Sequence, residues 1–177
     1  EAVAQEFVRT HTSIPVPRIR RCIADGHGHG YMVMERIEGV KLDRLWPSLN
    51  TWQRFIVVWT IRGYIRQLRH VSSDYVCRDV PGPMAETPQL CNRPNLMTRD
   101  KPFGPFDSAP EFYQYWNDQY KDKVRARNFC LDDTVPLVLT HNDLRPGNII
   151  VGRDGKIWLI DWDQAGFYPP WQEYLGM

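Results

Sequence analysis

The residue types best suited to chemistry lie in one short stretch, His141-Asn142-Asp143-Leu144-Arg145-Pro146-Gly147-Asn148, and in Ile160-Asp161-Trp162 just beyond it. Together they supply two carboxylates, Asp143 and Asp161, and one carboxamide, Asn148. A phosphoryl-transfer site needs a base for an attacking hydroxyl and oxygen ligands for the magnesium that bridges the nucleotide phosphates. The spacing His-x-Asp-x4-Asn followed by Asp therefore predicts phosphoryl-transfer chemistry.

Taken singly, these residues also have structural explanations. Asn142 and Asp143 can cap a turn, and Asp161 can simply end a strand. The complete spacing, combined with the apolar hairpin that follows it, favours a reaction site over turn capping.

Three short apolar runs frame the motif and predict buried strands: Leu137–Leu139, Ile149–Val151 and Ile157–Ile160. The last two are joined across Gly152-Arg153-Asp154-Gly155, which predicts a hairpin. Asp143 and Asn148 then lie on the loop before the hairpin. Because the hairpin folds the chain back, we expect Asp161 at its end to lie beside Asn148.

The first third of the chain predicts a helix and two strands. Residues 1–10 have helical spacing, with Val3, Phe7 and Val8 on one side. The helix ends at Ile14-Pro15-Val16-Pro17, and a strand through Ile19 and Ile23 follows. The next strand, Tyr31–Met34, follows the turn Asp25–Gly30 and leaves through Glu35-Arg36-Ile37-Glu38-Gly39. Such an exit is typical of a hinge whose backbone can hydrogen-bond the edge of a purine.

Helices dominate the middle of the sequence. A short helix interrupted by Pro47 is predicted over residues 42–49, and the clearest helix covers residues 51–70 with Thr51 as its N-cap. The apolar face of this second helix is so broad that it predicts a buried core helix. Residues 72–108 show no convincing regular element. Ser108-Ala109-Pro110-Glu111 is a capping box that begins a further helix.

That last helix carries an apolar stripe at helical intervals: Phe112, Trp116, Tyr120 and Val124. Core packing is the favoured interpretation of the stripe, and a role in lining an acceptor pocket is the alternative.

Composition excludes several classes of function. The 177 residues carry a formal net charge of +1, which gives no electrostatic reason to expect nucleic acid or an anionic membrane as a partner. The four cysteines contain no Cys-x-x-Cys pair, so a zinc site or a disulfide framework is not expected, and a reducing, cytoplasmic compartment fits. Apolar runs are too short for a membrane span, and no signal peptide opens the sequence. The abrupt ends, Glu1 and Met177, are typical of a fragment of a longer protein.

These motifs, in this order, resemble the aminoglycoside phosphotransferase family of the protein-kinase-like superfamily, to which choline kinases are related. The resemblance extends over the whole chain and includes Thr12–Pro17, the hinge, Gly104-Pro105-Phe106 and Asp161–Gly166. It implies a single α+β domain with the two-lobe fold of protein kinases. Residues 1–36 would form a partial N-lobe with a hinge near 34–38. Residues 39–177 would form a mostly helical C-lobe that carries the small β-hairpin.

The resemblance also implies roles for the motif residues. Asp143 matches the catalytic aspartate that orients the acceptor hydroxyl, and Asn148 and Asp161 match the two Mg²⁺ ligands. His141 matches a structural histidine of the loop. Arg145 would be a cation able to neutralise charge on the transferring phosphoryl group.

The nucleotide, ATP, is implied to bind through the hinge and the first helix. Met34, Glu35, Arg36 and Ile37 would hold the adenine. Glu1, or alternatively Glu6 in the same helix, would match the glutamate that pairs with the lysine holding the α- and β-phosphates.

Two departures from the family pattern bear on function. Asn142 stands where protein kinases carry an arginine, which favours a small-molecule kinase; the same His-Asn-Asp triplet occurs in choline and ethanolamine kinases. Neither the glycine-rich phosphate loop nor its lysine strand can be placed, since both would precede Glu1.

The leading prediction is an ATP- and Mg²⁺-dependent phosphotransferase acting on a small-molecule hydroxyl. A catalytically impaired pseudokinase or binding remnant and a choline- or ethanolamine-kinase-like enzyme are the alternatives. A protein kinase is disfavoured because no Ala-Pro-Glu-like segment follows Asp161. Oligomeric state stays open.

Overall fold

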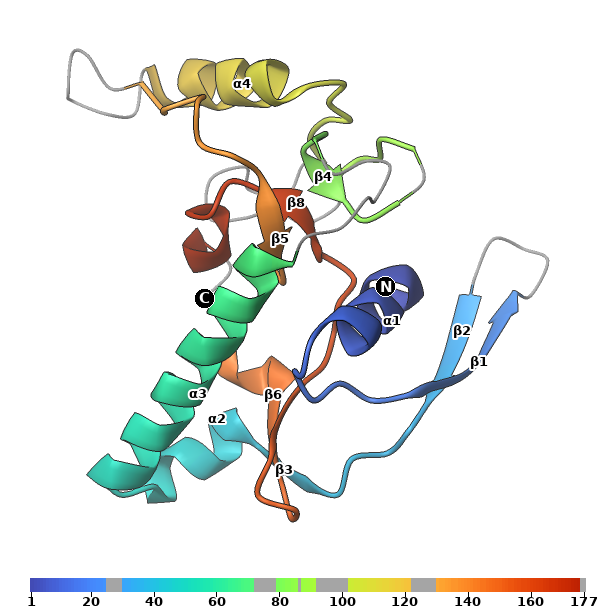
Figure 1. Ribbon diagram of the computed structural model, residues 1–177, viewed down its shortest axis with the longest axis vertical. Coiled ribbons are helices and arrows are strands. Elements are labelled where there is room, and N and C mark those ends of the chain that lie inside the picture. The colour runs from blue at the N-terminus through green and yellow to red at the C-terminus, as the bar shows by residue number, and fades with distance from the viewer. Residues whose placement is uncertain (25–29, 72–78, 86, 92–101, 122–129, 176–177) are drawn as a thin grey trace.

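The computed structural model describes residues 1–24, 30–71, 79–85, 87–91, 102–121 and 130–175. Helices and short strands are mixed along the chain, as the sequence predicts. In the view of Figure 1, α3 runs along one flank, the β1–β2 pair stands on the opposite flank, and α4 lies at the far end from β3. The expected turn Asp25–Gly30, except Gly30, and Val124 of the predicted stripe lie outside the described residues.

The first helix, α1 (Ala2–His11), ends just before the proline-rich segment, as predicted. Its buried side chains are Ala4, Gln5 and Val8. The predicted apolar face was therefore wrong in part, since Val3 is 53% exposed. Gln5 takes the inward position because its side-chain amide donates a 2.7 Å hydrogen bond to the Pro17 carbonyl. This bond ties α1 to the segment that leads into the first strand.

Two antiparallel strands follow, β1 (Ile19–Ala24) and β2 (Gly30–Met34), and both were predicted. The hairpin around the motif is also present. In it, β6 (Ile149–Gly152) pairs antiparallel with β7 (Ile157–Leu159), and the short β3 (Gly39–Lys41) adds to the outer edge of β6. The backbone N–H of Leu159 donates to the Pro15 carbonyl at 3.0 Å, which fixes the hairpin against the segment after α1.

The chain then forms α2 (Leu42–Leu45), a 3-10 turn η1 (Trp46–Ser48) that contains Pro47, and the long helix α3 (Thr51–His70). The predicted N-cap of α3 was one residue late. Asn50 is the cap, because its side chain accepts the Gln53 N–H at 2.9 Å and the Gln53 side chain accepts the Asn50 N–H at 2.9 Å.

The prediction that α3 is a buried core helix was wrong. Only Val57, Ile65 and Leu68 are buried, on the side that packs against β5 and β7. The opposite side is exposed and carries a row of large apolar side chains: Trp52, Phe55, Ile56, Val58 and Trp59. Within the described ranges no element covers that side, so the helix is apolar around most of its circumference but buried along one face only.

The remaining elements form a second centre of packing. Helix α4 (Ala109–Lys121) follows the predicted capping segment, where Ser108 Oγ accepts the Glu111 N–H. A three-stranded sheet has the order β4 (Gly82–Pro83), β8 (Gly166–Tyr168) and β5 (Val138–Thr140). Two more 3-10 turns complete the fold, η2 (Pro146–Asn148) and η3 (Gln172–Leu175).

The aromatic side chains of the stripe on α4 pack in the core, as the favoured interpretation predicted. Trp116 and Phe112 are fully buried and meet Phe103 and Tyr168 in one aromatic cluster. Among the described residues, no helix combines the length and apolarity needed to cross a bilayer.

Candidate active site

Two loops carry the motif, and hydrogen bonds fasten one to the other. His141 is fully buried, its ring lies 4.3 Å from that of Trp162, and Nε2 donates to the Ile160 carbonyl at 3.1 Å. The N–H of Ile160 in turn donates to the Asn148 carbonyl at 3.0 Å. Burial lowers the pKa of His141 to about 4, so the ring is neutral at physiological pH. The structural role predicted for His141 is thus matched by a contact that places Asp161 next to the first loop.

The predicted base and one predicted metal ligand touch directly. The side-chain nitrogen of Asn148 donates to Oδ2 of Asp143 at 2.6 Å and to the Asp143 carbonyl at 3.0 Å. Because the amide nitrogen faces Asp143, the amide oxygen of Asn148 is turned the other way. Asp143 is 6% exposed and Asn148 is 4% exposed, so the pair is held in a largely dry setting.

Arg145 lies between the two motif aspartates. Its Nε is 3.3 Å from Oδ2 of Asp143, and one terminal nitrogen is 3.9 Å from Oδ2 of Asp161. Just over half of the Arg145 side chain is exposed, so the guanidinium is a solvent-screened bridge rather than a buried ion pair.

Both loops contain a residue in the left-handed region, Asn142 with φ of 64° and Asp161 with φ of 70°. Asn and Asp are the non-glycine residues that adopt this conformation most readily. Backbone outliers of this kind gather at functional sites, where the surrounding structure holds them in place.

A hollow of about 390 Å³ joins nearly all of the predicted site residues. Its walls come from the residue before α1, the proline-rich segment, the end of β2 and the hinge, β3, the loop before the hairpin, β6 and the residues just after β7: Glu1, Pro17, Met34, Glu35, Ile37, Lys41, Arg145, Asn148, Ile150, Ile160 and Asp161. Asp143 is not part of the wall but contacts two residues that are, Arg145 and Asn148. Arg36, also predicted to hold the adenine, is exposed and does not line the hollow.

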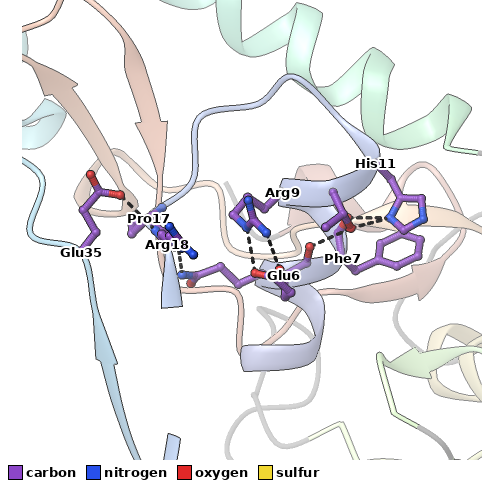
Figure 2. A network of polar contacts seen from close by, with 9 residues as sticks. Glu6, Phe7, Arg9, His11, Pro17, Arg18 and Glu35 are labelled. Atoms are coloured by element: carbon purple, nitrogen blue, oxygen red, sulfur yellow. Dashed lines mark hydrogen bonds and ion pairs between the residues drawn. The ribbon is translucent and has the colours of Figure 1, made fainter. Parts of the chain in front are cut away.

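The choice between Glu1 and Glu6 follows from their surroundings. Glu6 is exposed, and its carboxylate accepts a hydrogen bond from Arg9 Nε at 2.8 Å (Figure 2). Glu1 instead lines the hollow. Burial raises the pKa of the Glu1 carboxyl, and the carboxylates of Asp161 and Asp163 raise it further. Of the two, Glu1, the residue that precedes α1, is therefore the one that faces the motif.

The hinge segment is anchored where it leaves β2. The Glu35 N–H donates to the Arg18 carbonyl at 2.8 Å, and the Glu35 carboxylate accepts the Arg18 N–H at 3.3 Å (Figure 2). These two bonds fix Glu35, the first residue after β2, at one wall of the hollow.

Sequence reasoning missed two residues at this site. Lys41, at the end of β3, lines the hollow and also a second one of about 510 Å³, which shares Arg145 and Asn148 with the first. The only sequence signal for Lys41 is its place directly after the hinge. The second residue, Glu173 on η3, is 1% exposed and accepts two backbone hydrogen bonds from the motif loop. Nothing in the local pattern around Glu173 indicates this contact.

The side chains present fit a nucleotide with Mg²⁺. Mg²⁺ is usually held by one or two carboxylates, with phosphate and water oxygens completing an octahedron. Asp161 and the outward-turned amide oxygen of Asn148 are such donors, and the nearby Glu1 and Asp163 carboxylates make the setting negative. Within the described residues no group of three acidic, histidine or cysteine side chains forms a metal cage. The donor set thus fits an ion shared with phosphates better than an ion bound by protein alone.

The sequence profile of the phosphotransferase enzyme family matches residues 2–177. Among solved structures, a thermostable mutant of aminoglycoside phosphotransferase APH(4)-Ia in ternary complex with ADP and hygromycin B has 17% sequence identity and a TM-score of 0.60. The match covers 99% of this chain and 59% of that chain.

A second mutant of the same phosphotransferase, in complex with AMP-PNP and hygromycin B, also has 17% identity, with a TM-score of 0.56 and coverage of 97% and 58%. A search of curated proteins gave no match. At this identity the structural likeness shows the fold, and the chain spans less than two thirds of the length of either structure.

Proposed function

The chain belongs to the phosphotransferase enzyme family, and we propose that it transfers the γ-phosphoryl group of ATP, with Mg²⁺, to a hydroxyl group of a small molecule. The observation that carries the proposal is the hollow that brings the hinge segment, Glu1 at the N-terminus of α1 and the motif residues Arg145, Asn148 and Asp161 to one place. We further propose that residues 1–36 and 39–177 act as two lobes on either side of this hollow, with the hinge near 34–38.

The nucleotide is proposed to lie along the hollow with its adenine at the hinge. The bonds between Glu35 and Arg18 fasten the start of the hinge, so its backbone can recognise the edge of a purine with little reorganisation. Glu1, Lys41 and Arg145 line the rest of the hollow, and the two cations are suited to phosphate oxygens.

Asn148 and Asp161 are the proposed metal ligands. Bound to them, Mg²⁺ would neutralise charge on the β- and γ-phosphates as the phosphoryl group departs. The Asn148 amide nitrogen holds Asp143 while its oxygen faces away, so one side chain links the metal position to the base.

Asp143 is the proposed base for the acceptor hydroxyl. Its carboxylate is oriented by Asn148 and lies 3.3 Å from the Arg145 Nε. A carboxylate held in this way orients the hydroxyl toward the phosphorus and receives its proton. Arg145 can move from the aspartates toward the transferring phosphoryl group, because more than half of its side chain is exposed.

A second candidate function is that of a module that binds nucleotide but does not catalyse phosphoryl transfer. The observation that favours it is the Arg145 guanidinium, which contacts both Asp143 and Asp161. If that bridge persisted with nucleotide bound, neither carboxylate would be available for its catalytic role.

The test combines nucleotide binding with a turnover screen. Thermal shift with ATP should show stabilisation that needs Mg²⁺, and the shift should be lost in Asp161→Ala but kept in Asp154→Ala, an exposed aspartate at the hairpin tip. ADP release should then be followed with amino alcohols, sugars and aminoglycosides as acceptors. Mg²⁺-dependent binding with acceptor-dependent ADP release supports the phosphotransferase. Binding with no release for any acceptor supports the second candidate, and absence of Mg²⁺-dependent binding contradicts both.

A further inference from the structure

A second hollow lies beside the one proposed to hold the nucleotide. Its volume is about 510 Å³, and its lining residues are Lys41, Asp43, Trp46, Arg145, Pro146, Gly147 and Asn148. Three of these residues, Lys41, Arg145 and Asn148, also line the first hollow. The two hollows therefore meet at the two cations and the amide that are assigned above to the phosphates and to Mg²⁺.

The second hollow also lies next to the proposed base. In phosphoryl transfer the attacking and leaving oxygens lie roughly in line, on opposite sides of the phosphorus. A nucleotide in the first hollow thus leaves the acceptor to approach from another side. Asn148 donates to Oδ2 of Asp143 at 2.6 Å, and Arg145 Nε lies 3.3 Å from the same oxygen. Because both residues line the second hollow, an acceptor bound there lies beside Asp143.

The segment after the hinge forms one wall of the second hollow. Lys41 lies in β3, which pairs with β6, and α2 packs against β6 and η2; β3, β6 and α2 lie together in Figure 1. Leu42, between the exposed Lys41 and Asp43, is buried in the core. The Arg54 guanidinium lies 5.4 Å from the ring centroid of Trp46 and donates to its carbonyl at 3.2 Å. Contacts outside the hollow thus hold this wall in place.

Asp43 turns one carboxylate oxygen toward the motif loop. Its Oδ1 accepts the Arg44 N–H at 2.8 Å, and its Oδ2 lies 3.8 Å from the position that a Cβ on Gly147 would take. The φ of Gly147 is not in the left-handed region, so the backbone does not require glycine there. The missing side chain instead leaves space between Asp43 and the loop. Among the described residues, Oδ2 of Asp43 has no hydrogen-bond or ion-pair partner.

The charges of the lining discriminate among classes of acceptor. Lys41 and Arg145 place two positive charges on the side shared with the first hollow, and Asp43 adds one negative charge. A cationic acceptor would come close to both cations, and one exposed, water-screened carboxylate does not offset that repulsion. An anionic acceptor would face Asp43 and the nucleotide phosphates. An uncharged acceptor with several hydroxyl groups avoids both, since the carboxylate accepts from hydroxyls and Trp46 and Pro146 offer an apolar surface.

We propose that the second hollow binds the acceptor, that the acceptor is an uncharged sugar or polyol, and that Asp43 selects it by accepting hydrogen bonds from its non-reacting hydroxyls. The proposal rests on the proposed function. The reacting hydroxyl oxygen bonds the γ-phosphorus as the bond from phosphorus to the β,γ-bridging oxygen breaks; ADP leaves, and the hydroxyl proton passes to Asp143. Since Asp43 does not touch the nucleotide, its loss should weaken use of the acceptor and leave nucleotide binding nearly unchanged.

The class of acceptor is tested on the wild type with matched sugars: glucose against glucosamine and galactose against galactosamine. Each pair differs in one hydroxyl replaced by an amino group. myo-Inositol, ethanolamine and kanamycin complete the panel, and acceptor-dependent ADP release gives kcat/KM. The best uncharged acceptor should exceed the best amine at least ~10-fold, because like charges brought together are costly. A smaller preference, or transfer to amines alone, overturns this proposal and leaves the proposed function standing.

The role of Asp43 is tested with Asp43→Asn. Asparagine can keep the Arg44 bond with its oxygen, and it then turns an NH2 group, a donor, into the hollow. A hydrogen bond to a charged group changes an equilibrium about 10- to 100-fold, so kcat/KM for the best uncharged acceptor should fall ~10- to 100-fold. KM for ATP should stay within ~3-fold.

The matched control is Asp107→Asn, because Asp107 is an exposed aspartate just before α4 that lines neither hollow. Asp107→Asn should match the wild type in both constants. An Asp43→Asn variant whose acceptor kcat/KM stays within ~3-fold of the wild type overturns the role of Asp43. A loss that appears mainly in KM for ATP does so as well.

Binding without turnover separates this proposal from the proposed function. Calorimetric titration of the same sugars into protein with Mg²⁺ and AMP-PNP measures their Kd. An uncharged sugar should bind the wild type and bind Asp43→Asn at least ~10-fold more weakly. A wild type that transfers phosphate to no acceptor contradicts the proposed function, and these Kd values then decide the second hollow alone. Equal binding to both proteins, or no binding of any uncharged sugar, overturns the proposal.

Discussion

Two buried groups, His141 of the motif loop and Glu173 bonded to it, are expected to change the stability of the protein in opposite directions as pH varies. Burial raises the pKa of Glu173 to about 7 from an ordinary 4.5, and it lowers the pKa of His141 to about 4 from an ordinary 6.5. The contribution of Glu173 is fully present below pH 4.5 and is lost as pH rises through 7. The contribution of His141 is present above pH 6.5 and is lost as pH falls through 4.

The magnitude follows from the two pKa values. Each pKa unit corresponds to about 1.4 kcal/mol, so each group contributes roughly 3 kcal/mol across its range. Between about pH 4.5 and 6.5 the two effects nearly cancel in the wild type. Glu173→Gln removes one of them. The free energy of unfolding of the variant, minus that of the wild type, should therefore rise by roughly 3 kcal/mol between pH 4.5 and 8.

Urea denaturation at a series of pH values measures this difference, with Glu111→Gln as the control. Because Glu111 is exposed at the start of α4, its difference from the wild type should vary by less than ~0.5 kcal/mol over the same range. Arg69, whose charge lowers the pKa of Glu173, His141, whose N–H bonds Glu173, and the neighbouring Tyr174 are all retained in the variant. A Glu173→Gln difference that stays constant within ~0.5 kcal/mol, or that falls with pH, refutes the reasoning.

Three further predictions concern the elements around the site. Trp116→Ala should lower the free energy of unfolding by about 3–5 kcal/mol, because Trp116 is fully buried among the α4 aromatics; a loss below ~1 kcal/mol in chemical denaturation contradicts that packing. Asn50→Ala should lower the free energy of unfolding by about 1 kcal/mol through loss of the capping box with Gln53, and Thr51→Ala should lower it much less. A larger loss in Thr51→Ala than in Asn50→Ala would show that Thr51 is the N-cap. Gly63→Ala on α3 should raise the free energy of unfolding by about 0.5–1 kcal/mol and with it the thermal midpoint, because a Cβ added at Gly63 meets no neighbouring atom within 4 Å. A lowered midpoint would show that the space is occupied.

Local patterns in the sequence predicted the part of the fold that holds the motif. The β-branched runs on either side of Gly152–Gly155 predicted the hairpin, and β6 and β7 pair as expected. The proline-rich segment ended α1 as predicted, since proline cannot continue a helix. The hinge and the motif both line one hollow, and the pairing of β3 with β6 joins the segment after the hinge to the hairpin after the motif.

The errors have identifiable physical causes. Asn50 and Thr51 are both good N-cap residues, and the reciprocal bonds with Gln53 decide between them, a signal that the sequence does contain. The broad apolar face of α3 shows that the helix is suited to burial on most sides. It cannot show which of those sides has a neighbour, because that depends on elements distant in the sequence.

Glu173 and Lys41 were missed for a related reason. Glu173 reaches His141 from 32 residues away through η3, and no periodicity marks it. Lys41 faces the hollow because β3 pairs with β6, which is a contact between distant segments. Long-range pairing of this kind is set by tertiary structure and leaves no trace in the local sequence pattern.

The central claim is that Asp143 orients an acceptor hydroxyl for phosphoryl transfer from a nucleotide bound in the adjacent hollow. Its most direct test is transfer of labelled γ-phosphate to acceptor by wild type and Asp143→Ala, with the Kd of Mg²⁺-ATP measured on the same samples. We predict that Asp143→Ala lowers kcat at least ~1000-fold and leaves the Kd within ~3-fold. Transfer by Asp143→Ala within ~10-fold of the wild-type rate would contradict the account.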